Sequence, residues 1–498
     1  MNKRFYLIKQ RGIEPARFSL KLRGGEHRSP NAGYISCLSL LFRFLAIVLI
    51  AAMMLSVAAC AKTGAVLPND EKAPDAAPGA ADSAAQDQPL KGTLTISTCF
   101  NTFGLEEAVD LFTYLYPDVE IVLNKYDDDW EKYSMQVSAQ LVAGTSDDIM
   151  ELGFFSLVKL AERGFLADIN YLMRDDPGFN EDEYFMNVFR GMDYKGGLFA
   201  FPTSFNYMLI GVNNTFPDGF ADRFKQVETI SFSELLDVFL TLDDRGGRSA
   251  AYNLDAITFV SNNFRRFADY ESKTAHFNNE SFISSLVGWK EATDPQKITD
   301  GEIGWSRVSH ILPLEHQKES ARMYLFSNEP NYTYQIFLPP SDGDIFTHYM
   351  PVVTDAGKLI IDPARRYLIS ESSKNKELAW EFLKFITSDE RISGFDIRTA
   401  HPVNKEVFRR LAPDHLTNLI YSLRADNQAL DGSVPDLVAQ IMANVEKVCE
   451  MPMEFPHNYY DTMMIEMFGI LSNFYTGAVS AEQVASELQN KYSLYLLE

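Results

Sequence analysis

Asp127 and Glu151 are two carboxylates that could act as a catalytic pair in this chain. Glycoside hydrolysis needs a general acid and a second carboxylate, but an acidic chain holds many carboxylates, so this pair carries little weight. The sequence has no G-x-S-x-G nucleophile elbow, no P-loop ending in G-K-[ST], and no Cys-x-x-Cys or His-rich cluster for a metal. We therefore predict no catalytic residues, no resident metal and no cofactor.

Polar and aromatic side chains instead follow the segments that we predict as strands. Ser204, Asn206 and Tyr207 come after Pro202, in a predicted loop, and loops on a rigid scaffold often carry binding residues. The structural alternatives stay open, because Asp also populates solvated turns and most aromatic residues belong to the core. The candidate ligand-binding residues are Phe100, Asn101, Asp128, Trp130, Glu151, Ser204, Asn206, Tyr207, Trp305 and Asn328.

Alternating strands and helices must position these residues. Thr93 to Phe100 alternates in hydropathy, which predicts a strand, and helical spacing then runs from Leu105 until Pro117 ends it. The next predicted elements are a strand over 119–123, a helix over 133–141 ending at Gly144, a strand over 148–152 and a helix over 157–161. This order predicts a parallel sheet covered by helices, with ligands beyond the carboxyl ends of its strands.

The first 59 residues differ from the rest in charge and hydropathy. They carry nine Lys and Arg against two Asp and Glu, a net of 9 − 2 = +7, so the remainder carries −23 − 7 = −30. The apolar run FLAIVLIAAMMLSV over 44–57 fits a signal-peptide core and is shorter than the roughly 20 residues of a spanning helix. LSVAAC resembles a bacterial lipobox, which predicts a signal peptide over 1–59 and lipidation of Cys60. An uncleaved signal anchor is the alternative.

Residues 60–92 join this segment to the folded part. They are rich in Ala, Pro, Asp and Gly without apolar periodicity, which predicts a flexible tether. The acidic balance after it argues against a nucleic-acid partner, because phosphate binding needs a surplus of Lys and Arg. Cys99 and Cys449 remain in the folded part, where we expect two buried thiols rather than a disulfide.

Several segments, in order, resemble the extracellular solute-binding proteins of ABC importers, in the carbohydrate-type family 1 group. After the lipobox and tether come LTISTCF, LEEAVDLFTYLYPDVEIVL, SAQLVAGTSDDIMEL, LAERGFLADINYLM, GGLFAFPTSFNYMLIGVN, NKELAWEFLKFITSDE and HPVNKEVF. These matches cover most of residues 93–410, and GAVSAEQVASELQNKYSLYL extends the likeness loosely beyond them. One departure is the segment from Arg322 to Asn328, where the family commonly shows a glycine-rich pattern.

The resemblance implies an α/β fold of the periplasmic-binding-protein type, with two α/β lobes joined by a hinge and a ligand cleft between them. We expect lobe I to take residues 93–205 plus about 322–365, and lobe II about 206–321 plus 366–498. The first crossing between the lobes is expected near Phe201 to Val212, and no internal repeats are evident.

The resemblance also implies a function. A monomeric lipoprotein, held by Cys60 at the outer face of the cytoplasmic membrane or in the periplasm, would capture a small solute and deliver it to an ABC permease. The family makes a sugar or oligosaccharide the expected cargo. Two alternatives stay open, namely a surface lipoprotein enzyme acting on glycans and a lipoprotein that presents its ligand to a sensor.

Overall fold

The structure is a computed structural model of the chain. It describes residues 90–99, 104–126, 129–153, 155–213, 219–241, 251–252, 256–292, 323–326, 346–388, 400–424, 433–456 and 462–498. All described residues lie within one compact unit, Gln86–Glu498.

Three parallel strands begin the folded part, as the alternating pattern predicted. β1 (Gly92–Thr98) pairs in parallel with β2 (Val119–Lys125) and with β3 (Ile149–Glu151). The connecting helices are α2 (Leu105–Leu115), α3 (Trp130–Ala143) and, after β3, α4 (Leu157–Glu162). Gly144 ends α3 in the left-handed conformation, where a residue without Cβ is not strained.

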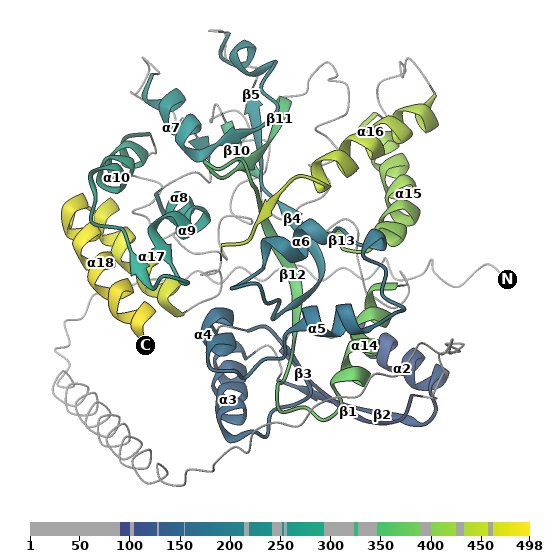
Figure 1. The fold of residues 1–498 in the computed structure, drawn as a ribbon. Coiled ribbons are helices and arrows are strands. Elements are labelled where there is room, and N and C mark those ends of the chain that lie inside the picture. The colour runs from purple at the N-terminus through teal and green to yellow at the C-terminus, as the bar shows by residue number, and fades with distance from the viewer. Residues whose placement is uncertain are drawn as a thin grey trace, which may run out of the picture. The chain divides into compact units, whose positions relative to one another are not determined.

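Long antiparallel strands then carry the chain from one hydrophobic core to another. β4 (Phe201–Tyr207) pairs with β12 (Leu359–Ile369), and β5 (Leu209–Asn213) pairs with β11 (Phe346–Val353). β12 also pairs with β3, so one sheet runs in the order β2-β1-β3-β12-β11-β5-β10-β7 (Figure 1). The chain therefore crosses after β4 and returns in the β11–β12 hairpin.

Each core defines a lobe, and we keep these two names below. Besides β1–β4, α2–α4 and β12, lobe I contains α5 (Ile169–Asp175), η2 (Glu181–Glu183), α6 (Met186–Gly191), α14 (Lys376–Ser388), β13 (His401–Pro402), α15 (Lys405–Arg424), α16 (Val434–Cys449) and β14 (Met453–Glu454). Most buried residues of β5 and β11 belong to the core of lobe II. Lobe II contains η3 (Phe220–Phe224), β6 (Ile230–Ser231), α7 (Phe232–Leu240), β7 (Ala251–Tyr252), α8 (Ala256–Asn262), α9 (Phe264–Phe267), β8 (Ala268–Asp269), β9 (Thr274–Ala275), α10 (Glu280–Ala292), β10 (Met323–Phe326), α17 (Thr462–Tyr475) and α18 (Ala481–Leu497).

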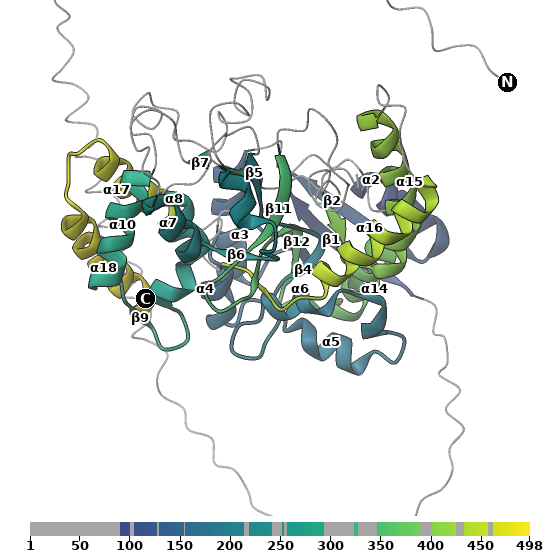
Figure 2. The same ribbon diagram turned by 90° about the horizontal axis from the view of Figure 1, so that it is seen from above.

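The lobe boundaries differ from those expected in the C-terminal part. α14, α15 and α16 pack into the core of lobe I, whereas we had expected residues 366–498 in lobe II, and β10 belongs to lobe II rather than lobe I. The chain leaves the first core after Phe455 and enters the second at Met464, which makes a third passage. Figure 2 shows α15 and α16 on one side of the strands and α10, α17 and α18 on the other.

Cys99 and Cys449 are both buried and neither forms a disulfide, as expected. Burial, reinforced by the charges of Glu450 and Glu446, raises the pKa of the Cys449 thiol well above its usual value. Within the ranges that the structure describes, no helix is long and apolar enough to cross a membrane.

Candidate functional site

Glu151 ends β3 at the carboxyl edge of the parallel strands, where ligands of such sheets bind. Its side chain is buried, with 1% of its surface exposed, and its Oε2 accepts hydrogen bonds from the Thr98 hydroxyl at 2.6 Å and the Cys99 N–H at 3.2 Å. Glu151 therefore ties the ends of β1 and β3 together. Six predicted residues lie outside the described residues: Cys60, Phe100, Asn101, Asp128, Trp305 and Asn328.

Trp130 is the first residue of α3 and packs against the core of lobe I. Its ring meets that of Tyr133 edge to face at 5.9 Å, while the preceding Asp129 caps the helix by accepting a hydrogen bond from the Lys132 N–H at 3.0 Å. Tyr133 is fully buried, and burial together with the Glu151 charge raises the pKa of its hydroxyl. The contacts of Trp130 and Asp129 are thus those of a packed helix start.

Ser204, Asn206 and Tyr207 lie in β4, so the prediction that they belong to a hinge loop was wrong. We had expected Pro202 to break the strand, but it sits near the strand start, opposite Arg366 of β12. Proline lacks a donor for the ladder and is tolerated at the beginning of a strand. All seven residues of β4 are buried.

The alternation of β4 divides these three residues between two faces. Tyr207 stacks on His401 at 5.6 Å, on the face that packs into the core of lobe I. Ser204 and Asn206 point to the opposite face, because side chains alternate along a strand. The structure therefore brings Ser204 and Asn206 together and separates Tyr207 from them.

Two charged residues of β12 share the face of Ser204 and Asn206. Asp362 pairs with Asn206, and Arg366 pairs with Pro202 in the same antiparallel register, so their side chains project to one side. We call Ser204, Asn206, Asp362 and Arg366 the polar face. Glu151 pairs with Tyr367, the neighbour of Arg366, and so lies on the other side of the sheet.

Sequence reasoning missed Asp362 and Arg366, although a signal was present. Both charges interrupt the apolar strand LIIDPARRYLI at a spacing of four, which places them on one face of a strand. Arg366 is buried, and its guanidinium lies over the Phe455 ring at 5.3 Å. A buried charge in a strand normally has a specific role, because leaving it without compensation is costly.

The polar face offers a carboxylate, a guanidinium, an amide and a hydroxyl, which can donate and accept hydrogen bonds. Desolvation by burial raises the pKa of Asp362 to about 6, against the opposing charge of Arg366. Among the described residues, no cluster of His, Cys, Asp or Glu could hold a metal ion. A small hollow lined by Tyr194, Arg265, Ala268, Asp269, Tyr270 and Glu271 contains none of the predicted site residues.

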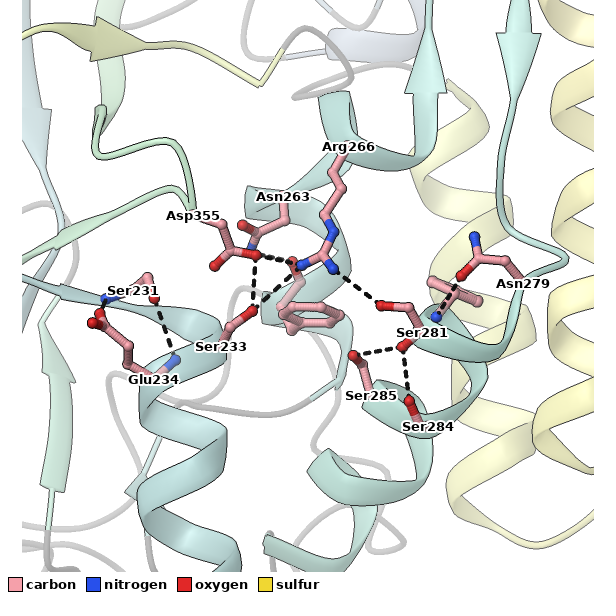
Figure 3. Close-up of polar contacts among 12 residues, drawn as sticks. Ser231, Ser233, Glu234, Asn263, Arg266, Asn279, Ser281, Ser284, Ser285 and Asp355 are labelled. Atoms are coloured by element: carbon pink, nitrogen blue, oxygen red, sulfur yellow. Dashed lines mark hydrogen bonds and ion pairs between the residues drawn. The ribbon is translucent and has the colours of Figure 1, made fainter.

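A second polar cluster lies in lobe II, around Arg266 of α9 (Figure 3). Its guanidinium forms an ion pair with Asp355 in the β11–β12 turn and donates to the Ser281 hydroxyl of α10 at 3.0 Å. The Ser233 hydroxyl of α7 donates to Asp355 at 2.8 Å. These contacts join two helix starts to the turn and satisfy one another, so we assign the cluster a structural role.

Comparisons with known proteins give the fold. No family model and no curated protein matches the chain. A family 1 extracellular solute-binding protein from Alicyclobacillus acidocaldarius is 17% identical with a TM-score of 0.52, over 83% of this chain and 100% of that one. A periplasmic oligogalacturonide-binding protein from Yersinia enterocolitica is 14% identical with a TM-score of 0.55, over 81% and 99%. A structure described as a de novo designed esterase is 13% identical with a TM-score of 0.54, over 82% and 99%.

At these identities the likeness establishes the fold alone. The chain has the α/β fold of periplasmic binding proteins, with two α/β lobes joined by crossing strands, so the predicted fold class is confirmed.

Proposed function

We propose that this chain is a membrane-tethered, extracytoplasmic solute-binding protein that captures a small solute and delivers it to an ABC permease. The observation that carries the proposal is the pair of separate hydrophobic cores joined by the β4–β5 passage and the β11–β12 hairpin. Two cores linked through a few strand residues can rotate about those strands. A solute that touches both lobes only when they are closed then shifts the population toward the closed state.

A sugar or oligosaccharide is the cargo that we propose. The polar face presents acceptors and donors side by side, in Asp362, Asn206, Ser204 and Arg366, as neighbouring sugar hydroxyls require. The Yersinia protein of the same fold is described as binding oligogalacturonides, and the Alicyclobacillus protein as a family 1 solute-binding protein. The description of the Yersinia protein agrees with a saccharide cargo.

The tether completes the proposal. Cleavage before Cys60 and its diacylation would leave the segment up to residue 92 as a spacer between the membrane and the lobes. A Cys60→Ser variant should then lose incorporation of a radiolabelled fatty acid. Unchanged labelling of that variant would contradict lipidation at Cys60.

Binding without catalysis is the form of the proposal that the described residues favour. The Glu151 carboxylate, one half of the pair that suggested a glycosidase, is buried and hydrogen-bonded to Thr98 and to the Cys99 backbone. Glycans recovered unchanged after long incubation with the protein would agree with a binder, whereas cleaved products would favour the enzyme alternative.

Thermal unfolding of the full-length chain in detergent tests solute binding directly. A ligand that binds only the folded state raises the melting temperature in proportion to the logarithm of its concentration. We expect such a rise with a member of a panel of gluco-, galacto- and galacturono-oligosaccharides, and none with control peptides or polyamines. A panel that leaves the melting temperature unchanged throughout would count against the proposed function.

A further inference from the structure

Asp362 lies where β12 runs between the two cores. Its neighbours Ile361 and Ile360 belong to the cores of lobe I and lobe II, respectively. Across the ladder it pairs with Asn206 of β4, while Ala364, two residues along β12, pairs with Ser204. Asp362 is thus a carboxylate at the centre of the polar face, at the strand positions where the chain passes from one lobe to the other.

One oxygen of this carboxylate is buried and accepts no hydrogen bond. Within the described part of the chain, Oδ1 of Asp362 is inaccessible and accepts no hydrogen bond, although the residue as a whole keeps part of its surface accessible. Asp148, at the start of β3, shows the usual arrangement. Its carboxylate accepts from the Thr95 N–H at 2.9 Å, the Thr95 hydroxyl at 3.0 Å and the Ser373 hydroxyl at 2.6 Å.

Such an oxygen is costly in the ligand-free protein, because a desolvated carboxylate without a donor loses its hydrogen bonds to water. The cost is consistent with the raised pKa of Asp362, which desolvation dominates. The charge of Arg366, on the same strand, acts against this rise. β4 carries no charged residue.

We propose that Asp362 is a solute-contacting residue whose Oδ1 accepts a hydrogen bond from a hydroxyl group of the bound sugar. This inference rests on the proposed function and assigns the polar face, from Ser204 to Arg366, to the solute site. The Asn206 amide and the Ser204 hydroxyl lie on the same face and can bind adjacent hydroxyls. The positive charge of Arg366 disfavours an ammonium group near Asp362, so a neutral hydroxyl is the donor.

Thermal unfolding of the full-length wild type and two matched variants, Asp362→Asn and Asp148→Asn, tests the inference. Without ligand, Asp362→Asn should melt above the wild type at pH 7.5, because the folded protein disfavours the charged carboxylate. The difference should shrink as the pH falls below about 6 and be lost only below about 3.9, where the Asp362 carboxyl group of the unfolded wild type is protonated as well. Asp148→Asn should melt below the wild type at pH 7.5, because it loses a fully bonded acceptor. With the oligosaccharide that stabilises the wild type, Asp362→Asn should bind at least tenfold more weakly.

A second variant keeps the test decisive if Asp362→Asn folds poorly. Ser204→Ala should weaken binding of the same oligosaccharide at least threefold, with a circular dichroism spectrum like that of the wild type. Equal affinity of both variants and the wild type would overturn the inference and leave the proposed function standing. If no oligosaccharide stabilises the wild type, the proposed function fails and the inference falls with it.

Discussion

The Thr98 hydroxyl donates a 2.6 Å hydrogen bond to the Glu151 carboxylate, and this bond joins the last residues of β1 and β3. Both side chains are buried, with 2% and 1% of their surface exposed. A carboxylate at that depth needs donors from the protein, since water cannot reach it. The pair therefore fixes the carboxyl edge of the parallel strands.

Thr98→Val should destabilise the protein by about 1–3 kcal/mol, because it removes a donor from a buried carboxylate while keeping the side-chain shape. Urea unfolding followed by circular dichroism measures the change. Thr93→Val is the matched control on the same strand, since the Thr93 hydroxyl donates to Glu120 at 3.3 Å on the exposed surface. If Thr98→Val and Thr93→Val lowered the free energy of unfolding equally, the structural role of Thr98 would be contradicted.

Gly153→Ala should also destabilise the carboxyl edge. A Cβ at this position would meet the Tyr133 ring at 2.9 and 3.0 Å and the Ser134 hydroxyl at 3.1 Å, and Tyr133 is fully buried and cannot move aside freely. We expect a loss of about 1–3 kcal/mol, the usual range for overpacking, measured by thermal unfolding.

Gly469→Ala provides the control for Gly153→Ala. Gly469 lies within α17 and its Cβ would meet no atom within 4 Å, so alanine should be neutral or stabilise the helix by about 0.5–1 kcal/mol. If Gly469→Ala destabilised the protein and Gly153→Ala did not, the close approach of Tyr133 would not be what requires glycine at position 153.

Local periodicity was sufficient to predict the parallel strands and their helices. Hydropathy alternates through β1 because one face of that strand is buried more completely, and Gly144 marks the end of α3 because only glycine adopts its conformation without strain. Ser480 and Gln483 form a capping box at the start of α18, which the sequence pattern S-x-x-Q indicates. Each of these signals is carried by residues close together in the chain.

Signals that depend on distant partners were not predictable in this way. The apolar residues of α14 recur at helical spacing, which shows that one helix face is buried but not in which core. The helix packs in lobe I, whereas we had expected lobe II. Pro202 lies in a strand because β12 pairs alongside it, which the local sequence does not reveal. Asp362 joined the candidate site only when its pairing with Asn206 was known.

His401 should make the fold sensitive to acid. It is fully buried against Tyr207, and burial, with the charge of His415, lowers its pKa to about 3. The unfolded chain binds this proton near pH 6.5, so stability falls as the pH drops from about 6.5 toward 3, by about 1.4 kcal/mol per pH unit. His401→Phe should lose about 2–3 kcal/mol of that dependence between pH 6.5 and 4.5, measured by urea unfolding.

The control for His401→Phe is the same change at His276, which is exposed and shares a hydrogen bond with Thr274. His276→Phe should keep the acid dependence of the wild type. An acid dependence that persists unchanged in His401→Phe would show that another group is responsible.

α4 is packed against both cores and therefore ties the lobes together at one point. Leu157 and Leu160 belong to the core of lobe I, whereas Val158 belongs to the core of lobe II. At its end, Glu162 accepts from the Tyr194 hydroxyl at 2.8 Å and pairs with Lys273 of lobe II at 3.5 Å. Any motion of one lobe against the other must either keep the contacts of α4 and Glu162 or break them.

Glu162→Gln should lower the stability by about 0.5–1 kcal/mol at pH 7, a modest value because the lysine partners are largely exposed. Burial raises the pKa of Glu162, but hydrogen bonds from Tyr194 and Lys195 and the charge of Lys273 outweigh it, so the pKa lies below the usual value. A lowered pKa stabilises the fold above the unfolded pKa and loses that effect as the pH falls. The difference between variant and wild type, followed by thermal unfolding, should therefore shrink as the pH falls below the usual pKa of a glutamate and also in 1 M salt. A difference that stays constant would assign the effect to packing instead.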